Sequence, residues 1–182
     1  RLELVHADIR DFFKHPQKYT IAQNSGYHVV ANIPYYITGE IIRLFLESEQ
    51  LPLSMTLLVQ KEVAERITRE KKESILSLSV KAYGEPHYEF TVPRGAFVPA
   101  PKVDSAVLSI RNISRRHFAT PQEENHFFTC VHAGFAHKRK QLAKNLAEAG
   151  LPAARVAPGI RAEDLSLDEW LILVTSSRIM HT

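Results

Sequence analysis

The sequence lacks the residues and runs that several protein classes require. It contains a single cysteine, Cys130, so it cannot form an internal disulfide framework. We therefore expect a small buried side chain at Cys130 and a reducing, cytoplasmic location. No stretch approaches the roughly eighteen consecutive apolar residues of a bilayer span, and we expect no membrane partner. Nine histidines are present without the paired spacing of a metal-binding helix, so we predict no metal.

A strong overall charge is also absent, but the charge that is present is unevenly placed. The formal net charge is only +3, with a pI near 9.0. Between residues 133 and 161 the sequence has six lysines and arginines and one acid, Glu148. This local excess predicts a basic surface in the second half of the chain.

The pattern over residues 1–113 predicts an α/β sheet. Short apolar runs alternate with amphipathic segments, in three strand and helix steps that are followed by a pair of strands. Thr38 is the expected N-cap of the first long helix, and Gly84 is the expected end of a later one. The expected strands are the run ending at Asp8 and residues 27–33, 54–60, 87–92 and 105–111; the expected helices are residues 39–48, 61–70 and 74–84.

Residues 114–182 predict a small all-helical domain after a polar, basic linker. Thr120 and Pro121 favour a helix start, and a second helix over residues 139–150 is expected to end at Gly150. Ser166 and Glu169 have the spacing of a capping box before the last helix.

The stretch "NIPYYITG" follows the apolar strand at residues 27–33, and the carboxyl end of a strand is where open α/β sheets bind ligands. The Asn32 side-chain oxygen and a backbone carbonyl near Pro34 could accept hydrogen bonds from an exocyclic amine, with the Tyr35 ring as a stacking partner. Such a set suits a flipped adenine. The plainer alternative is that Pro34 stops the strand, Asn32 caps the turn and Tyr35 and Tyr36 pack in the core; we assign packing to Tyr36 in either case.

The chemistry of an adenine amine explains why such a motif needs no histidine or glutamate. The nitrogen lone pair is delocalised into the ring, so fixed acceptors for both N–H groups help the nitrogen to attack an electrophilic methyl group. The proton becomes acidic after the attack and can leave through water, so a Brønsted base is not obligatory.

Five blocks in the same order resemble the ribosomal RNA adenine dimethyltransferases of the small-subunit type: "NIPY", "LLVQKEVAERI", "FVPAPKVDSAVLSI", "FAHKRKQLAKNL" and "RAEDLSLDEW". The resemblance implies an incomplete Rossmann-like S-adenosylmethionine-dependent methyltransferase sheet, followed by a helical RNA-binding domain. It implies S-adenosylmethionine as methyl donor and N6,N6-dimethylation of two adjacent adenosines in a hairpin loop near the 3′ end of small-subunit (16S) rRNA. The implied partner is an immature 30S-type subunit during ribosome biogenesis, and we expect a monomer.

The resemblance also assigns roles to single residues. Asp8 matches an acid that contacts the adenine part of the cofactor, and Asn32 matches the residue that touches both cofactor and target amine. Tyr35 matches the ring stacked on the target base, and Phe97 matches a second aromatic at that pocket. By composition alone, Asp8 is a turn or cap residue and Phe97 a core residue. We expect Lys102 and Asp104 to be loop anchors or ion-pair partners without a catalytic role.

The run "HKRKQLAKN" supplies the predicted RNA contacts. In a helix its cations would repel one another unless a polyanion offset them, and phosphate contacts do so; the alternative is a merely solvated face. Arg161 in "RAEDLS" is expected to pair with an acid at the start of the last helix. The predicted RNA-binding residues are Lys138, Arg139, Lys140 and Lys144.

Two features of the family have no counterpart in this sequence. No glycine-rich "GxGxG" turn follows a strand, and no acidic residue for the cofactor ribose precedes "LELVHAD". The chain also begins at Arg1, so we expect a fragment that binds cofactor weakly when isolated. The alternatives are the antibiotic-resistance enzymes that modify large-subunit rRNA, and a non-catalytic RNA- or DNA-binding relative such as an assembly factor or a mitochondrial transcription factor.

Overall fold

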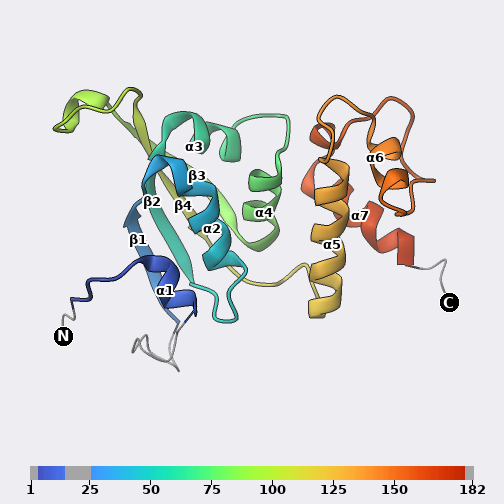
Figure 1. Ribbon diagram of the computed structural model, residues 1–182, viewed down its shortest axis with the longest axis horizontal. Coiled ribbons are helices and arrows are strands. Elements are labelled where there is room, and N and C mark those ends of the chain that lie inside the picture. Colours follow the sequence, from blue (N-terminus) through green and yellow to red (C-terminus); the bar gives the residue numbers. More distant parts are fainter. Residues whose placement is uncertain (1–3, 15–25, 179–182) are drawn as a thin grey trace.

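A four-stranded mixed sheet forms the centre of the first half of the chain (Figure 1). The computed structural model describes residues 4–14 and 26–178, without the side chains of 176–178. The strands lie in the order β1-β2-β4-β3, with β1 parallel to β2 and the other two pairings antiparallel. Their bounds are β1 His28–Asn32, β2 Ser54–Gln60, β3 Glu85–Val92 and β4 Ser105–Arg111.

Three helices pack together on one face of this sheet, and a shorter one lies beside them. The alternation of side chains along the strands explains the packing: Met55, Leu57 and Val59 on β2 are fully buried, whereas Thr56 between them is exposed. The face that carries the buried residues is therefore the face that the helices cover. The helices are α1 Ile9–Lys14, α2 Thr38–Leu46, α3 Lys61–Thr68 and α4 Ile75–Tyr83.

Three expectations for this half are wrong. Residues 4–8 form no strand: their backbone pairs with no strand of the described residues, and Leu4 is 94% exposed. Thr38 is not an N-cap, because the short 3₁₀ helix η2 (Tyr35–Ile37) precedes it and Thr38 already has helical dihedral angles. Helices α3 and α4 follow one another without a strand between them, so the described residues contain two of the three expected strand and helix steps.

The second half is helical, as predicted. Its elements are α5 Pro121–Gly134, α6 Leu142–Glu148, the 3₁₀ helix η4 Ala162–Asp164 and α7 Leu167–Arg178. Trp170 on α7 is fully buried, and a Cβ added at Gly134 would lie 2.5 Å from its ring, so this close approach requires glycine. Cys130 is buried, as expected. In the described residues no helix is long and apolar enough to cross a membrane.

The helix caps of this half also follow the sequence. Thr120 Oγ1 accepts from the Glu123 amide at 3.2 Å, and the Ser166 amide donates to Glu169 at 2.8 Å. Gly150, just past the end of α6, has a φ of +69°, which favours glycine.

Residues 112–120 connect the two halves, and the predicted boundary at 113/114 lies within this connection. The connection is packed rather than freely solvated, because the amide of Ser114 donates to the Tyr83 carbonyl and Phe118 is buried. Glu124 on α5 accepts hydrogen bonds from the Tyr83 hydroxyl and from Arg115, at 2.9 Å for the arginine. These contacts fasten α5 to α4.

Candidate active site

One edge of the sheet brings together four separate parts of the sequence. Because β1 and β2 are parallel, their carboxyl ends, at Asn32 and Gln60, lie at the same edge. Ser105, the first residue of β4, pairs with Gln60 and with Val92 at the end of β3. The segment between β3 and β4, residues 93–104, therefore leaves and re-enters the sheet at the same edge as Asn32, with β2 between them, and Figure 1 shows it projecting beyond the strands.

The Asn32 side chain is exposed at this edge and makes no hydrogen bond with the described residues. Ile33 extends the strand by one further bond, from its amide to the Leu58 carbonyl at 3.3 Å. The Pro34 carbonyl is already engaged, because it accepts from the Ile37 amide at 3.1 Å and from Thr38 Oγ1 at 3.4 Å. The Ile33 carbonyl accepts no hydrogen bond from the described residues. The acceptor next to Asn32 that remains open is thus the carbonyl of Ile33.

The two tyrosines of the motif have different surroundings. Tyr35 is half-buried, and its hydroxyl lies 2.5 Å from the Ser105 hydroxyl. Tyr36 is 88% exposed, so the expectation that it packs in the core is wrong. The 3₁₀ turn explains the difference, because its three residues per turn direct consecutive side chains about 120° apart.

The segment 93–104 carries Phe97 and is fastened at its base by Asp104. The Asp104 carboxylate accepts from the Arg94 amide at 2.9 Å, and its carbonyl accepts from the Lys61 amide at 3.0 Å. Asp104 is therefore the loop anchor that the sequence predicts. Phe97 is half-buried, and the exposed Lys102 makes no ion pair with the described residues. A groove of about 610 Å³ lies between this segment and the start of α3.

Asp8, the predicted contact for the cofactor adenine, is held by Arg10. The Arg10 guanidinium donates two hydrogen bonds to its carboxylate, at 3.0 and 2.6 Å, and these bonds with the amide bond from Arg10 lower the pKa of Asp8 to about 2. Asp8 raises the pKa of Arg10 most strongly, and Glu40 and Tyr36 add smaller contributions, so this pair lies near the start of α2. A carboxylate has more acceptor positions than these bonds use, so the ionised Asp8 could still accept from the exocyclic amine of an adenine; its contact with the cofactor stays a prediction.

The basic segment is a turn rather than a helix at its centre. Lys138, Arg139 and Lys140 lie between α5 and α6, and α6 begins only at Leu142, so the helix expected over residues 139–150 is shorter. All four predicted cations are exposed, including Lys144 on α6. Lys140 is partly neutralised, because its ammonium lies 2.8 Å from Glu148. Lys138, Arg139 and Lys144 make no ion pair with the described residues.

Asn145 holds this basic turn in place. Its buried Nδ2 donates to the Gly134 carbonyl at 2.5 Å and to the His137 carbonyl at 3.2 Å, on either side of the bend after α5. Its Oδ1 is buried and has no hydrogen-bond partner in the described part of the chain. The last residue of the "HKRKQLAKN" run is thus structural, whereas the cations before it are exposed.

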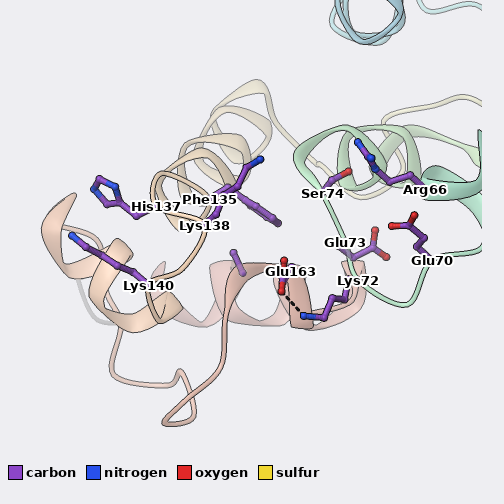
Figure 2. A pocket seen from close by; sticks show the side chains of 12 residues that line it. Arg66, Glu70, Lys72, Glu73, Ser74, Phe135, His137, Lys138, Lys140 and Glu163 are labelled. Carbon is purple, nitrogen blue, oxygen red and sulfur yellow. Dashed lines mark hydrogen bonds and ion pairs between the residues drawn. The ribbon is translucent and has the colours of Figure 1, made fainter. Parts of the chain in front are cut away.

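Figure 2 shows a pocket of about 330 Å³ that the two halves of the chain line together. Lys138 and Lys140 line it from the basic turn, and Arg66 lines it from α3. Two of the four predicted RNA-binding residues therefore lie at the border of a hollow that the sheet-containing half also lines.

The "RAEDLS" block fastens the two halves, which the sequence reasoning missed. Lys72 forms an ion pair with Glu163 and lies 3.7 Å from Asp164, and the Glu73 amide donates to the Glu163 carbonyl at 2.8 Å. The expected ion pair of Arg161 is not formed in the described residues; instead its backbone amide donates to Asp164 at 2.9 Å. Lys72 is the ion-pair partner of the acids in this block. Lys72 and Glu163 are 91 residues apart, so the sequence alone could not predict this contact.

Comparison with known proteins identifies relatives along nearly the whole chain. The family model described as "Ribosomal RNA adenine dimethylase" matches residues 1–176. Proteins named "Ribosomal RNA small subunit methyltransferase A" are 39% identical over 93% of the chain in Dehalococcoides mccartyi and 40% identical over 83% of the chain in Fusobacterium nucleatum. The chain spans 61% of the length of each of these two curated relatives.

Two solved structures share the fold. One is a dimethyladenosine transferase from Plasmodium falciparum, with a TM-score of 0.70 and 20% identity, covering 88% of this chain and 70% of that one. The other is the 23S rRNA methyltransferase ErmE, with a TM-score of 0.66 and 22% identity, covering 93% of this chain and 75% of that one. At these identities the likeness concerns the fold alone, and it supports a methyltransferase-type sheet followed by helices.

Proposed function

Because this chain belongs to the ribosomal RNA adenine dimethylase family, we propose that it is the target-recognising part of an enzyme that dimethylates adenosine at N6 in ribosomal RNA. The observation that carries the proposal is the open amide of Asn32 beside the anchored ring of Tyr35, at the carboxyl edge of the sheet. A purely binding relative would need neither an unpaired acceptor nor a fixed ring at this edge.

The recognition step uses two acceptors and one ring. Asn32 Oδ1 and the Ile33 carbonyl accept the two N–H groups of the target amine, and Tyr35 stacks on the base. The Pro34 carbonyl keeps its role in the turn, which fixes both acceptors; Pro34 acts through this rigidity. Phe97 contacts the base from the segment 93–104. Since a base inside a duplex cannot reach this edge, the target is a loop or a flipped nucleotide.

S-adenosylmethionine supplies the electrophilic methyl group when it is bound. Asp8 is the residue of this chain that would hold its adenine end, and Arg10 keeps the Asp8 carboxylate ionised. Asn32 would contact both the cofactor and the target amine. The acceptors of Asn32 and Ile33 stabilise the positive charge that develops on the target nitrogen, and the released proton passes to water. No metal takes part in this scheme.

The names of the most similar relatives reported above support small-subunit rRNA as the proposed substrate. The proteins that are 39% and 40% identical are named for the small subunit, whereas the large-subunit enzyme ErmE is 22% identical. We therefore propose that the substrate is a pair of adjacent adenosines in a hairpin loop near the 3′ end of 16S rRNA, within an immature 30S-type subunit. The enzyme acts as a cytoplasmic monomer. Lys138, Arg139 and Lys144 contact RNA phosphates, and Lys140 contributes less because Glu148 competes for it.

The test uses the complete gene product and labelled S-adenosylmethionine with immature small subunits and, in a parallel reaction, with large-subunit RNA. Nuclease digestion and detection of dimethyladenosine follow. We expect dimethyladenosine with the wild type, and a loss of about 100-fold or more in rate for Asn32→Ala. Asn125→Ala, which alters an exposed asparagine on α5, is the matched control and should retain full activity. Equal labelling after Asn32→Ala would refute the role of Asn32. Labelling of large-subunit RNA only would favour the antibiotic-resistance type, and no dimethyladenosine on either RNA would refute the enzyme.

A further inference from the structure

Ser105 ties together two motif blocks that are 70 residues apart. It is the first residue of β4 and closes the block "FVPAPKVDS", and its hydroxyl lies 2.5 Å from the hydroxyl of Tyr35 in "NIPY". Such a distance is that of a hydrogen bond between two hydroxyl groups, one of which donates to the other. Nothing in the proposed chemistry requires a serine at this place.

The anchor is more rigid than the ring that it holds. Ser105 is fully buried, and its strand pairs on both sides, with Gln60 on β2 and Val92 on β3. Tyr35 lies in a single 3₁₀ turn, is half-buried and forms no ring–ring contact with another aromatic residue in the described part of the chain. The free end of the tyrosine is therefore fixed to the sheet, while its ring remains only partly covered.

Tyr36 shows what the same turn does without this bond. Its hydroxyl forms no hydrogen bond with the described residues, and the side chain is 88% exposed. The two tyrosines share a backbone turn and a chemistry, but only the one with a serine partner is held against the protein. The position of the Tyr35 ring thus depends on Ser105 as well as on the Pro34 turn.

We propose that Ser105 is a positioning residue, which fixes the direction of the Tyr35 side chain from Cβ to the hydroxyl before the target base arrives. The proposal rests on the function proposed above, in which Tyr35 stacks on an adenine. A ring held at its Cα and at its hydroxyl loses little further freedom when a base stacks on it, so the binding step carries a smaller entropic cost. The same bond occupies the hydroxyl, so Tyr35 contributes a ring face rather than an acid or a base.

A double-mutant cycle tests the bond in the complete gene product. Ser105→Ala and Tyr35→Phe each remove it, and each is expected to lower kcat/KM for immature small subunits about fivefold to tenfold, the effect of one hydrogen bond. Because both changes remove one interaction, the double variant should lose about as much as either single variant. A double variant whose loss is the product of the two single losses would overturn the proposal.

The matched control is Ser109→Ala on the same strand. Ser109 is also buried, and its hydroxyl donates to Glu89, away from Tyr35. Its loss measures what removing a buried serine hydroxyl from β4 does to the fold, and kcat/KM should stay within about twofold of the wild type. Equal losses of activity in Ser105→Ala and Ser109→Ala would show a general effect on the strand and would overturn the positioning role.

A second readout needs no substrate. With 3-fluorotyrosine at position 35 the fluorine lies next to the hydroxyl, so its ¹⁹F chemical shift reports on the hydrogen bond of that hydroxyl. The wild type and Ser109→Ala should share one chemical shift, and Ser105→Ala should give a different one. Identical chemical shifts in all three proteins would overturn the tether even if some variant folds poorly. A wild type that forms no dimethyladenosine would overturn the proposed function. The ¹⁹F spectrum tests the hydrogen bond between Tyr35 and Ser105 independently of that function.

Discussion

Asn145 offers the sharpest test of how the basic turn is held. Its amide donates to the Gly134 and His137 carbonyls, and its own Oδ1 is buried without a partner in the described residues. Asn145→Ala removes two hydrogen bonds, each worth about 1 kcal/mol, and leaves the buried Gly134 carbonyl unsatisfied. It also removes the unpaired oxygen, whose burial costs about 1 kcal/mol or more. We expect a net loss of about 2 kcal/mol in the free energy of unfolding.

Asn145→Asp separates the hydrogen bonds from the shape of the side chain. An aspartate fills nearly the same space, but it places a carboxylate against two carbonyl oxygens in a buried site, so we expect a larger loss, about 3 kcal/mol or more. Urea unfolding of the complete gene product measures both changes. Asn125→Ala, on the exposed face of α5, should change stability by less than about 0.5 kcal/mol and serves as the control.

The same variants test the link between the turn and RNA. A loosened turn no longer presents Lys138 and Arg139 together, so Asn145→Ala should weaken binding to small-subunit RNA at low salt and flatten its salt dependence. The reasoning is refuted if Asn145→Ala is as stable as the wild type, or if it binds RNA with an unchanged salt dependence although it is destabilised.

Two further predictions concern other parts of the fold. The Asp8 carboxyl should show a pKa of about 2 in a carbon NMR titration, below its ordinary value of 3.8, and Arg10→Ala should return the pKa toward 3.8. Since the folded pKa is lowered, the contribution of the pair to stability is present above pH 3.8 and is lost as the pH falls toward 2. Gly84→Ala should destabilise the protein by about 1–3 kcal/mol in urea unfolding, because the new Cβ would lie 2.9 Å from the Arg111 carbonyl, whereas Gly95→Ala meets nothing within 4 Å and should be nearly neutral. An unshifted Asp8, or equal stability of the two alanine variants, would contradict these arguments.

Periodicity in the sequence predicted the elements that bury a regular face. The strand at residues 54–60 and the helix that starts at Lys61 were predicted because apolar residues recur at the spacing that their packing needs, and the caps at Thr120 and Ser166 were predicted from side chains that act locally. The strand expected before Asp8 is wrong because a strand also needs a partner, which a single run of residues does not reveal.

The site was predictable to the extent that its residues act through their neighbours in sequence. Asn32 ends a strand and Tyr35 follows it, and a ligand site at the end of a strand could be expected. The bond from Tyr35 to Ser105 and the ion pair of Lys72 with Glu163 span 70 and 91 residues, and only the folded chain brings their partners together. The roles of Asn32, Tyr35 and Phe97 stay predictions until the variants are measured.

The outer edge of β1 has a consequence for work with these 182 residues in isolation. In the described residues β1 pairs with β2 on one side only, and Val30 on this strand is 82% exposed. An edge strand with free backbone groups and an apolar side chain is a template for adding strands from other molecules. The isolated chain would therefore aggregate by strand addition as its concentration rises. Dilution would reduce this aggregation more than cooling would. The enthalpy of hydrophobic association is near zero around room temperature, so a small change in temperature hardly changes its equilibrium constant.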